Sequence, residues 1–200
     1  MASLRILTTL PRCPQHSSVL LAKRSFFSIQ GLSQKTHKER KVLNCSQKEA
    51  YAIISNVDDY YKFLPFCTRS QVYTSKKVSD SVTLQKAELE VGFGMFQEKY
   101  MSDVTLEEPR VVKAVAADAS IFKQMVTTWT ISPNMPMSKQ SAQSRYASSC
   151  LVEFDIKFEF ASPLHAQAGN AFFHKVADLM MKAFVDQCEK VYRKPATLKK

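Results

Sequence analysis

Acid–base chemistry has few candidate residues in this sequence. Glu98 and Tyr100 lie two residues apart in an alternating segment, so a strand there would direct both side chains to one face. Together with His165, they are the groups that an enzyme could use for proton transfer. The sequence has no HExxH motif, nucleophile elbow or phosphate-binding glycine loop. It therefore favours a protein that is not an enzyme. Catalysis through Glu98 stays an alternative, as does the simpler interpretation that Glu98 reaches solvent beside a β-bulge.

Metal and disulfide chemistry have no clear motif either. The five cysteines form no CxxC pair, and they are Cys13, Cys45, Cys67, Cys150 and Cys188. Their spacing indicates neither a zinc site nor a disulfide framework. We expect reduced, buried thiols that pack as small hydrophobic groups.

Apolar binding has more support, because aromatic residues recur at alternate positions of predicted strands. In segment 150–160, Phe154, Ile156 and Phe158 share one face, and Asp155 and Lys157 occupy the other. The same two-residue period predicts strands near residues 39–44, 70–75, 81–91, 96–106, 110–117, 121–131 and 150–160. Short connections favour sequential antiparallel pairing of these strands.

A long amphipathic helix is predicted after the last strand. Ser162 suits its N-cap and Pro163 its first position, and an apolar stripe continues to about Arg193. At 1.5 Å per residue this helix would be roughly 45 Å long.

Two short helical segments precede the strands. Ser46 and Glu49 form a capping box, and a further helical turn is predicted at residues 57–63. Since neither is long enough to partner the C-terminal helix, we expect an α+β fold in which a curved antiparallel sheet wraps around that helix. The space between them would be lined by apolar groups.

The N-terminal segment differs in composition from the rest. Residues 1–38 carry six Lys or Arg and no acidic residue, which is typical of a mitochondrial transit peptide; the alternative is a disordered basic tail. Without it, 22 basic residues face 18 acidic ones, which gives little support to nucleic-acid binding. We expect a disordered leader at 1–38, one domain at 39–194 with a flexible loop at 133–149, and a basic tail at 195–200.

Several motifs resemble the coenzyme Q-binding protein family of the helix-grip superfamily. They span residues 39–192 and comprise Arg40-Lys41-Val42-Leu43, Tyr60-Tyr61-Lys62-Phe63-Leu64-Pro65-Phe66-Cys67, Leu89-Glu90-Val91-Gly92-Phe93, Thr127-Thr128-Trp129 and Phe154-Asp155-Ile156-Lys157-Phe158-Glu159-Phe160. The resemblance implies a mitochondrial protein that binds ubiquinone and supports respiration and ubiquinone biosynthesis, without a catalytic cofactor. The loop at 133–149 looks longer than in that family.

Candidate binding residues follow from the expected apolar space. The ligand-binding candidates are Phe63, Leu64, Pro65, Phe93, Tyr100, Met125, Trp129, Phe154, Phe158, Phe172 and Leu179. The membrane-docking candidates are Lys62, Phe63 and Phe66. For the aromatic residues of both sets, ordinary core packing is the alternative.

The expected partners are ubiquinone and the matrix side of the mitochondrial inner membrane, where the protein would be peripheral. No nucleic-acid partner is expected. Some bacterial proteins that the sequence resembles are described as ribosome-associating factors, so a matrix ribosome is the remaining alternative partner. A general RNA-binding surface should be more basic than this domain.

Overall fold

The computed structural model describes residues 34–93, 96–116, 122–134, 149–162, 166 and 173–192. The strands are β1 Lys35–Leu43, β2 Cys67–Lys77, β3 Val82–Phe93, β4 Phe96–Glu107, β5 Val111–Ala116, β6 Phe122–Pro133 and β7 Cys150–Phe160. The helices are α1 Gln47–Ser55, the 3₁₀ helix η1 Val57–Lys62, and α4 Phe173–Tyr192.

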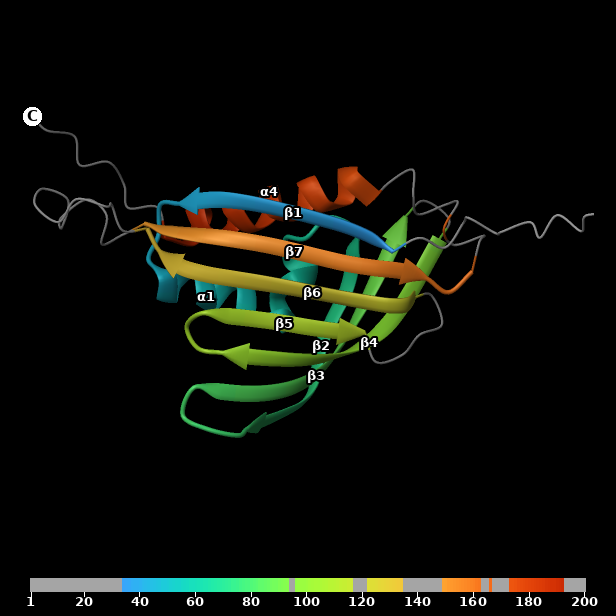
Figure 1. Ribbon diagram of the computed structural model, residues 1–200, viewed down its shortest axis with the longest axis horizontal. Helices are drawn as coiled ribbons and strands as arrows, with labels where there is room; N and C mark the ends of the chain where they lie inside the picture. The colour runs from blue at the N-terminus through green and yellow to red at the C-terminus, as the bar shows by residue number, and fades with distance from the viewer. Residues whose placement is uncertain are drawn as a thin grey trace, which may run out of the picture.

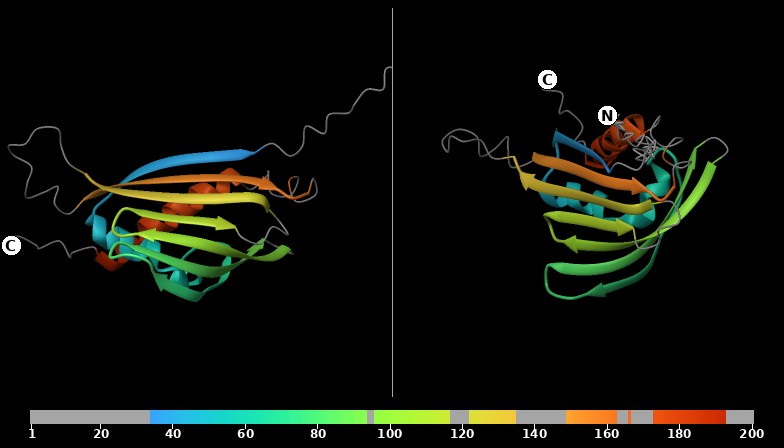
Figure 2. Two further views of the ribbon diagram at one scale, coloured as in Figure 1. Left: turned by 60° about the horizontal axis from the view of Figure 1, so that its bottom comes forward. Right: turned by 45° about the vertical axis from the view of Figure 1, so that its right-hand side comes forward.

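The described strands form one antiparallel sheet with the order β1-β7-β6-β5-β4-β3-β2. β2 to β7 pair sequentially, whereas β1 joins the far edge beside β7. The sheet curls around α4, which lies along its concave side near β1 (Figures 1 and 2). The predicted fold, a curved antiparallel sheet around a C-terminal helix, is confirmed.

Strand β1 starts earlier than the sequence predicts. Lys35 pairs with Phe158 of β7, so residues 35–38 belong to the sheet and not to a leader that ends at residue 38. Lys38 and Arg40 form ion pairs with Asp155 and Glu153 of β7. Of the six basic residues that indicated a leader, Lys35 and Lys38 belong to β1, and Lys38 lies on the outer face of this edge strand. The structure does not describe residues 1–33, so the predicted transit peptide lies outside the described residues.

The predicted capping box at the start of α1 is confirmed. The Glu49 backbone N–H donates to Ser46 Oγ at 3.3 Å, and the Ser46 N–H donates to Glu49 Oε2 at 2.7 Å. Two N–H groups at the helix start are thereby satisfied. α1 then buries Ala50 and Ile54 against the core.

Helix α4 buries one stripe toward the sheet. Ala177, Met181, Phe184 and Cys188 recur at intervals of three or four residues, and all four are almost fully buried. The sequence predicts a helix start at residue 163. Near this position the structure describes Ser162 and Ala166, and the Ala166 N–H donates to the Ser162 carbonyl at 3.0 Å. Within the described helices, none is long and apolar enough to cross a bilayer.

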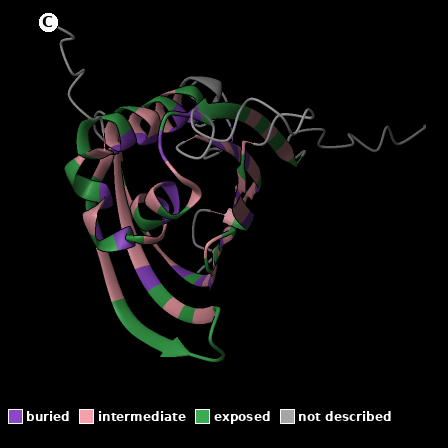
Figure 3. Cartoon of the chain, turned by 90° about the vertical axis from the view of Figure 1, so that its left-hand side faces the viewer, coloured by how far each residue is buried: buried purple, intermediate pink, exposed green. Residues whose placement is uncertain are grey.

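The opposite end of the sheet is exposed. Residues 73–81, at the β2–β3 hairpin, all lie in solvent, whereas the buried groups gather where the sheet faces the helices (Figure 3). β6 continues to Pro133, and the Asn134 N–H donates to the Ser149 carbonyl at 3.2 Å. The rest of the predicted flexible loop, 135–148, lies outside the described residues.

Candidate functional site

An open pocket of about 400 Å³ lies where the chain leaving η1 meets one flank of α4. Its apolar lining is Phe63, Pro65, Leu179 and Ala183, and its polar lining is Lys182, Asp186, Gln187 and Lys190. The pocket brings together three predicted ligand-binding residues from positions far apart in the sequence, Phe63, Pro65 and Leu179. Ala183, Lys182, Asp186, Gln187 and Lys190 also line the pocket and were not among the predicted site residues. Ala183 belongs to the apolar stripe predicted for this helix, whereas Lys182 was assigned to the opposite, polar face.

The pocket wall at Phe63 packs against two further aromatic rings. The Phe63 ring meets Phe184 edge-on at 5.2 Å between centroids, and Tyr60 at 5.9 Å. The Phe63 N–H donates to the Tyr60 carbonyl at 3.2 Å, which ends η1. Next in the chain, Leu64 is buried in the core and does not line the pocket. Phe63 thus belongs both to the core and to the pocket wall.

The rim of the pocket is basic with one acidic partner. Lys182 pairs with Asp186 one turn later on α4. Within the described part of the chain, Lys190 makes no ion pair and is exposed. An apolar floor with cationic and amide donors at its edge suits a ligand that has a hydrocarbon body and oxygen acceptors.

Trp129 and Phe154 lie deeper than the pocket. Their rings are 4.4 Å apart, and Trp129 is 4.6 Å from Phe184. Only 4% of Trp129 and 1% of Phe154 is exposed. Both rings fill the space between sheet and α4, and neither lines the pocket.

A second aromatic cluster lies on the concave face of β4, β6 and β7. Tyr100 and Phe122 meet edge-on at 5.7 Å, and Phe122 stacks on Phe160 at 5.5 Å. Phe158 lies 5.0 Å from Phe160 and pairs in register with Met125. This cluster holds three of the predicted site residues, Tyr100, Met125 and Phe158. Burial raises the pKa of the Tyr100 phenol, so it stays protonated at physiological pH.

Phe122 is a member of this cluster that strand periodicity missed. Strict alternation with Met125 and Trp129 places position 122 on the outer face. The β6–β7 register shifts between Phe122 and Gln124, and this irregularity brings Phe122 to the inner face.

The segment predicted to dock on a membrane is partly exposed. Lys62 is exposed and hydrogen-bonds Asp59, which raises the pKa of its ammonium group. Phe66 is half-buried and has a φ of 66°, which is uncommon for a residue other than glycine. Its carbonyl accepts the Gly92 N–H at 2.8 Å and so joins the segment to β3.

Two predicted site residues remain without a structural position for their side chains. The Phe93 side chain and all of Phe172 lie outside the described residues. His165, named for the catalytic alternative, does as well. Glu98 lies on the same strand face as Tyr100 and is half-buried, so it neither reaches the pocket nor stands fully in solvent.

The described cysteines are free thiols, as expected. Cys45 and Cys150 are buried together with Cys188 of α4. Hydrogen bonding to the Cys45 sulfur, with burial, raises the pKa of the Cys150 and Cys188 thiols. At Cys67, burial raises the pKa to about 11. The raised pKa keeps the Cys67, Cys150 and Cys188 thiols protonated at neutral pH, so these three are poor nucleophiles, whereas hydrogen bonds from Cys150 and Cys188 lower the pKa of Cys45.

Known proteins share both the sequence and the fold. Residues 43–185 match the family described as "Polyketide cyclase / dehydrase and lipid transport". The chain is 33% identical over 189 residues to the "Coenzyme Q-binding protein COQ10 homolog B, mitochondrial" of Xenopus laevis, covering 90% of this chain and 72% of that protein. It is 25% identical over 149 residues to the "Ribosome association toxin RatA" of Escherichia coli, covering 74% of this chain and 82% of that protein.

A solved structure supports the architecture. The Zhui aromatase/cyclase superposes with a TM-score of 0.63 over 82% of this chain and 99% of that one, at 12% sequence identity. This likeness concerns the fold alone. The sequence match from end to end of the domain is the stronger finding, and from it the chain belongs to the coenzyme Q-binding protein family, within the polyketide cyclase, dehydrase and lipid transport proteins.

Proposed function

We propose that this protein binds ubiquinone and carries it between the inner-membrane surface and the enzymes that use or make it. The observation that carries the proposal is the pocket that joins Phe63 and Pro65 to Leu179 and Ala183 of α4. The relationship to proteins named for coenzyme Q binding supports ubiquinone as the cargo. The pocket volume of about 400 Å³ falls within the usual range for small-molecule sites.

A carrier is needed because ubiquinone does not leave a bilayer readily. Exposing its polyprenyl tail to water costs about 0.8 kcal/mol for each CH₂ group. A protein that extracts the molecule must therefore replace the bilayer with apolar surface. The pocket supplies such a surface for the ring, and Lys182, Gln187 and Lys190 are donors for its oxygen atoms. The cluster around Phe122, with Tyr100 and Phe160 half-buried, is the apolar surface that we assign to the tail.

The chain between η1 and β2 is the surface that we assign to membrane docking. Lys62 is exposed, and Phe63 and Phe66 are half-buried apolar groups beside it. An exposed lysine is attracted to anionic lipid headgroups, and partly exposed apolar groups beside it can enter the bilayer surface. The left-handed backbone at Phe66 supports this assignment, because such conformations gather at functional segments. We place the protein on the matrix side of the inner membrane.

The proposal is for a binding protein and not for an enzyme. Glu98 and Tyr100, both half-buried, remain the groups on which catalysis would depend. Ribosome association belongs to the name of the bacterial relative. Salt-sensitive sedimentation of this protein with ribosomes is the result that would favour that function here.

The test is mass spectrometry of lipids extracted from the protein purified from cells that make ubiquinone. We expect ubiquinone in near-stoichiometric amount with the wild type and its loss in Leu179→Asp, which charges the pocket floor. Val191→Asp is the matched control, because Val191 is on the same helix, 50% exposed and outside the pocket. Ubiquinone retained by a folded Leu179→Asp protein would show that this pocket does not hold it. If both proteins instead carry a different lipid, that lipid and not ubiquinone is the cargo.

A further inference from the structure

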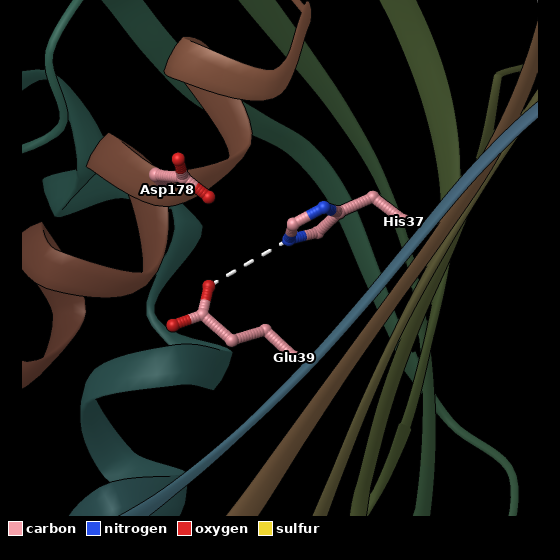
Figure 4. A group of neighbouring side chains, drawn as sticks. All are labelled: His37, Glu39 and Asp178. Carbon is pink, nitrogen blue, oxygen red and sulfur yellow. Dashed lines mark ion pairs between the residues drawn. The ribbon is translucent and has the colours of Figure 1, made fainter.

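Three side chains that commonly bind metals meet between the edge strand and the long helix. His37 and Glu39 come from β1, and Asp178 comes from α4 (Figure 4). One ligand atom from each residue lies within 4.8 Å of the other two. His37 Nε2 is 3.6 Å from Glu39 Oε2. None of the three belongs to the pocket described above.

Strand geometry explains why these residues face the helix. His37 and Glu39 are two positions apart, so their side chains share one face of β1. That face points toward α4, and the His37 ring lies 6.4 Å from the core ring of Phe154. Lys38 and Arg40, on the opposite face, are paired with Asp155 and Glu153 of β7. The cationic side chains at 38 and 40 are thus directed away from the cluster.

The negative charges of Glu39 and Asp178 are not neutralised by a described lysine or arginine. Among the residues with described positions, neither Glu39 nor Asp178 has an ion pair with Lys or Arg. Glu39 Oε2 is buried and accepts no hydrogen bond from a described group. Only 16% of the His37 side chain and 26% of the Glu39 side chain is exposed. Two carboxylates held this close, one of them largely out of water, favour binding of a divalent cation.

We propose that His37, Glu39 and Asp178 form a Zn²⁺ site that joins β1 to α4. Two ligand atoms at the usual zinc distances and the tetrahedral angle are about 3.4 Å apart. The His37–Glu39 distance of 3.6 Å already matches this separation. Asp178 is exposed on the helix, so its side chain is free to turn toward the other two. Water would complete the coordination.

The ligand types select zinc over the common hard cations. Calcium and magnesium prefer sites made of oxygen alone, whereas an imidazole nitrogen beside carboxylates suits zinc. The site would stabilise the folded protein by fastening an edge strand to the helix that the sheet surrounds. This role does not depend on which lipid the protein binds.

The test is zinc binding to the full chain, measured by calorimetry, with thermal unfolding at increasing zinc concentration. We expect the wild type to bind one equivalent with rising Tm, and Asp178→Asn to bind at least about ten-fold more weakly. Since Asp178 is exposed, this variant tests the site without disturbing the core. Glu189→Gln is the control, as an exposed acid on the same helix outside the cluster. Equal affinity for zinc in the wild type and Asp178→Asn overturns the proposal, as does an absence of binding.

Cobalt(II) gives an independent readout that separates this site from the thiols. Nitrogen and oxygen ligands produce d–d bands alone, and we expect these bands to be lost in His37→Gln. A thiolate-to-cobalt charge-transfer band would mean that cysteine holds the metal, and would overturn the assignment to His37, Glu39 and Asp178.

Discussion

The ring of Phe184 in α4 packs against the ring of Trp129 in β6, with 4.6 Å between centroids and an interplanar angle of 61°. The same Phe184 ring meets Tyr60 and Phe63 edge-on, each at 5.2 Å. One side chain of the long helix therefore joins the sheet, the 3₁₀ helix and the wall of the pocket. Damage to this core should alter the pocket as well as the stability.

Phe184→Ala should lower the free energy of unfolding by about 3–5 kcal/mol, because it leaves a cavity where a ring only 1% exposed was packed. Chemical denaturation measures this loss. Val191→Ala, at a 50% exposed position of the same helix, should change stability by less than about 0.5 kcal/mol. Equal effects of the two substitutions would show that Phe184 does not organise the core.

Tyr60→Phe should destabilise the protein by about 1 kcal/mol, since the buried Tyr60 hydroxyl donates to the Ile54 carbonyl. The substitution keeps the ring packed and removes only this bond between η1 and α1. Tyr61→Phe provides the comparison, because Tyr61 is 50% exposed. If equilibrium denaturation gives both variants the stability of the wild type, the bond contributes nothing to the fold.

Removal of one positive charge from the pocket rim should weaken binding to anionic vesicles. Lys190→Gln is expected to cost about 1 kcal/mol, roughly a five-fold loss of affinity, and the loss should shrink as salt is added. Lys76→Gln, in the exposed β2–β3 hairpin, is the control. Vesicle flotation that gives both variants the same affinity would show that the pocket rim at Lys190 takes no part in the membrane contact.

Labelling of Cys67 should be slow at neutral pH and should accelerate as the pH approaches 11, since burial raises the pKa of this thiol to about 11 from an ordinary value of 9.0. The folded state holds the proton more tightly than the unfolded one, so this thiol favours folding below pH 9 and that contribution is lost as the pH rises through 11. Maleimide labelling followed by peptide mass spectrometry measures the rate. Denatured protein should label with the ordinary pH dependence, and a native protein that does the same would show that Cys67 is not shielded.

Much of the architecture was predictable because it depends on local patterns. The two-residue period of segment 150–160 predicted the bounds of β7, and Ser46 with Glu49 predicted the start of α1. The predicted apolar stripe of α4 ran through Leu179, Phe184 and Val191, and only Phe184 of these is on the buried face, since Val191 is 50% exposed. Periodicity and capping are properties of neighbouring residues, so they can be read before the fold is known. With the family resemblance, they led to the correct fold class.

The positions of the sites depended on contacts between distant segments. Phe122 reaches the inner face only through an irregularity in the β6–β7 pairing, which no local period reports. His37 looked like part of a basic leader until pairing with β7 placed it in β1, opposite Asp178 of α4. Likewise, Phe63 and Leu179 line one pocket only because the chain after η1 returns to the flank of the helix. The sequence by itself determined the type and order of the helices and strands, whereas the tertiary structure decided which of their faces are buried against one another, because that choice rests on long-range pairing and packing.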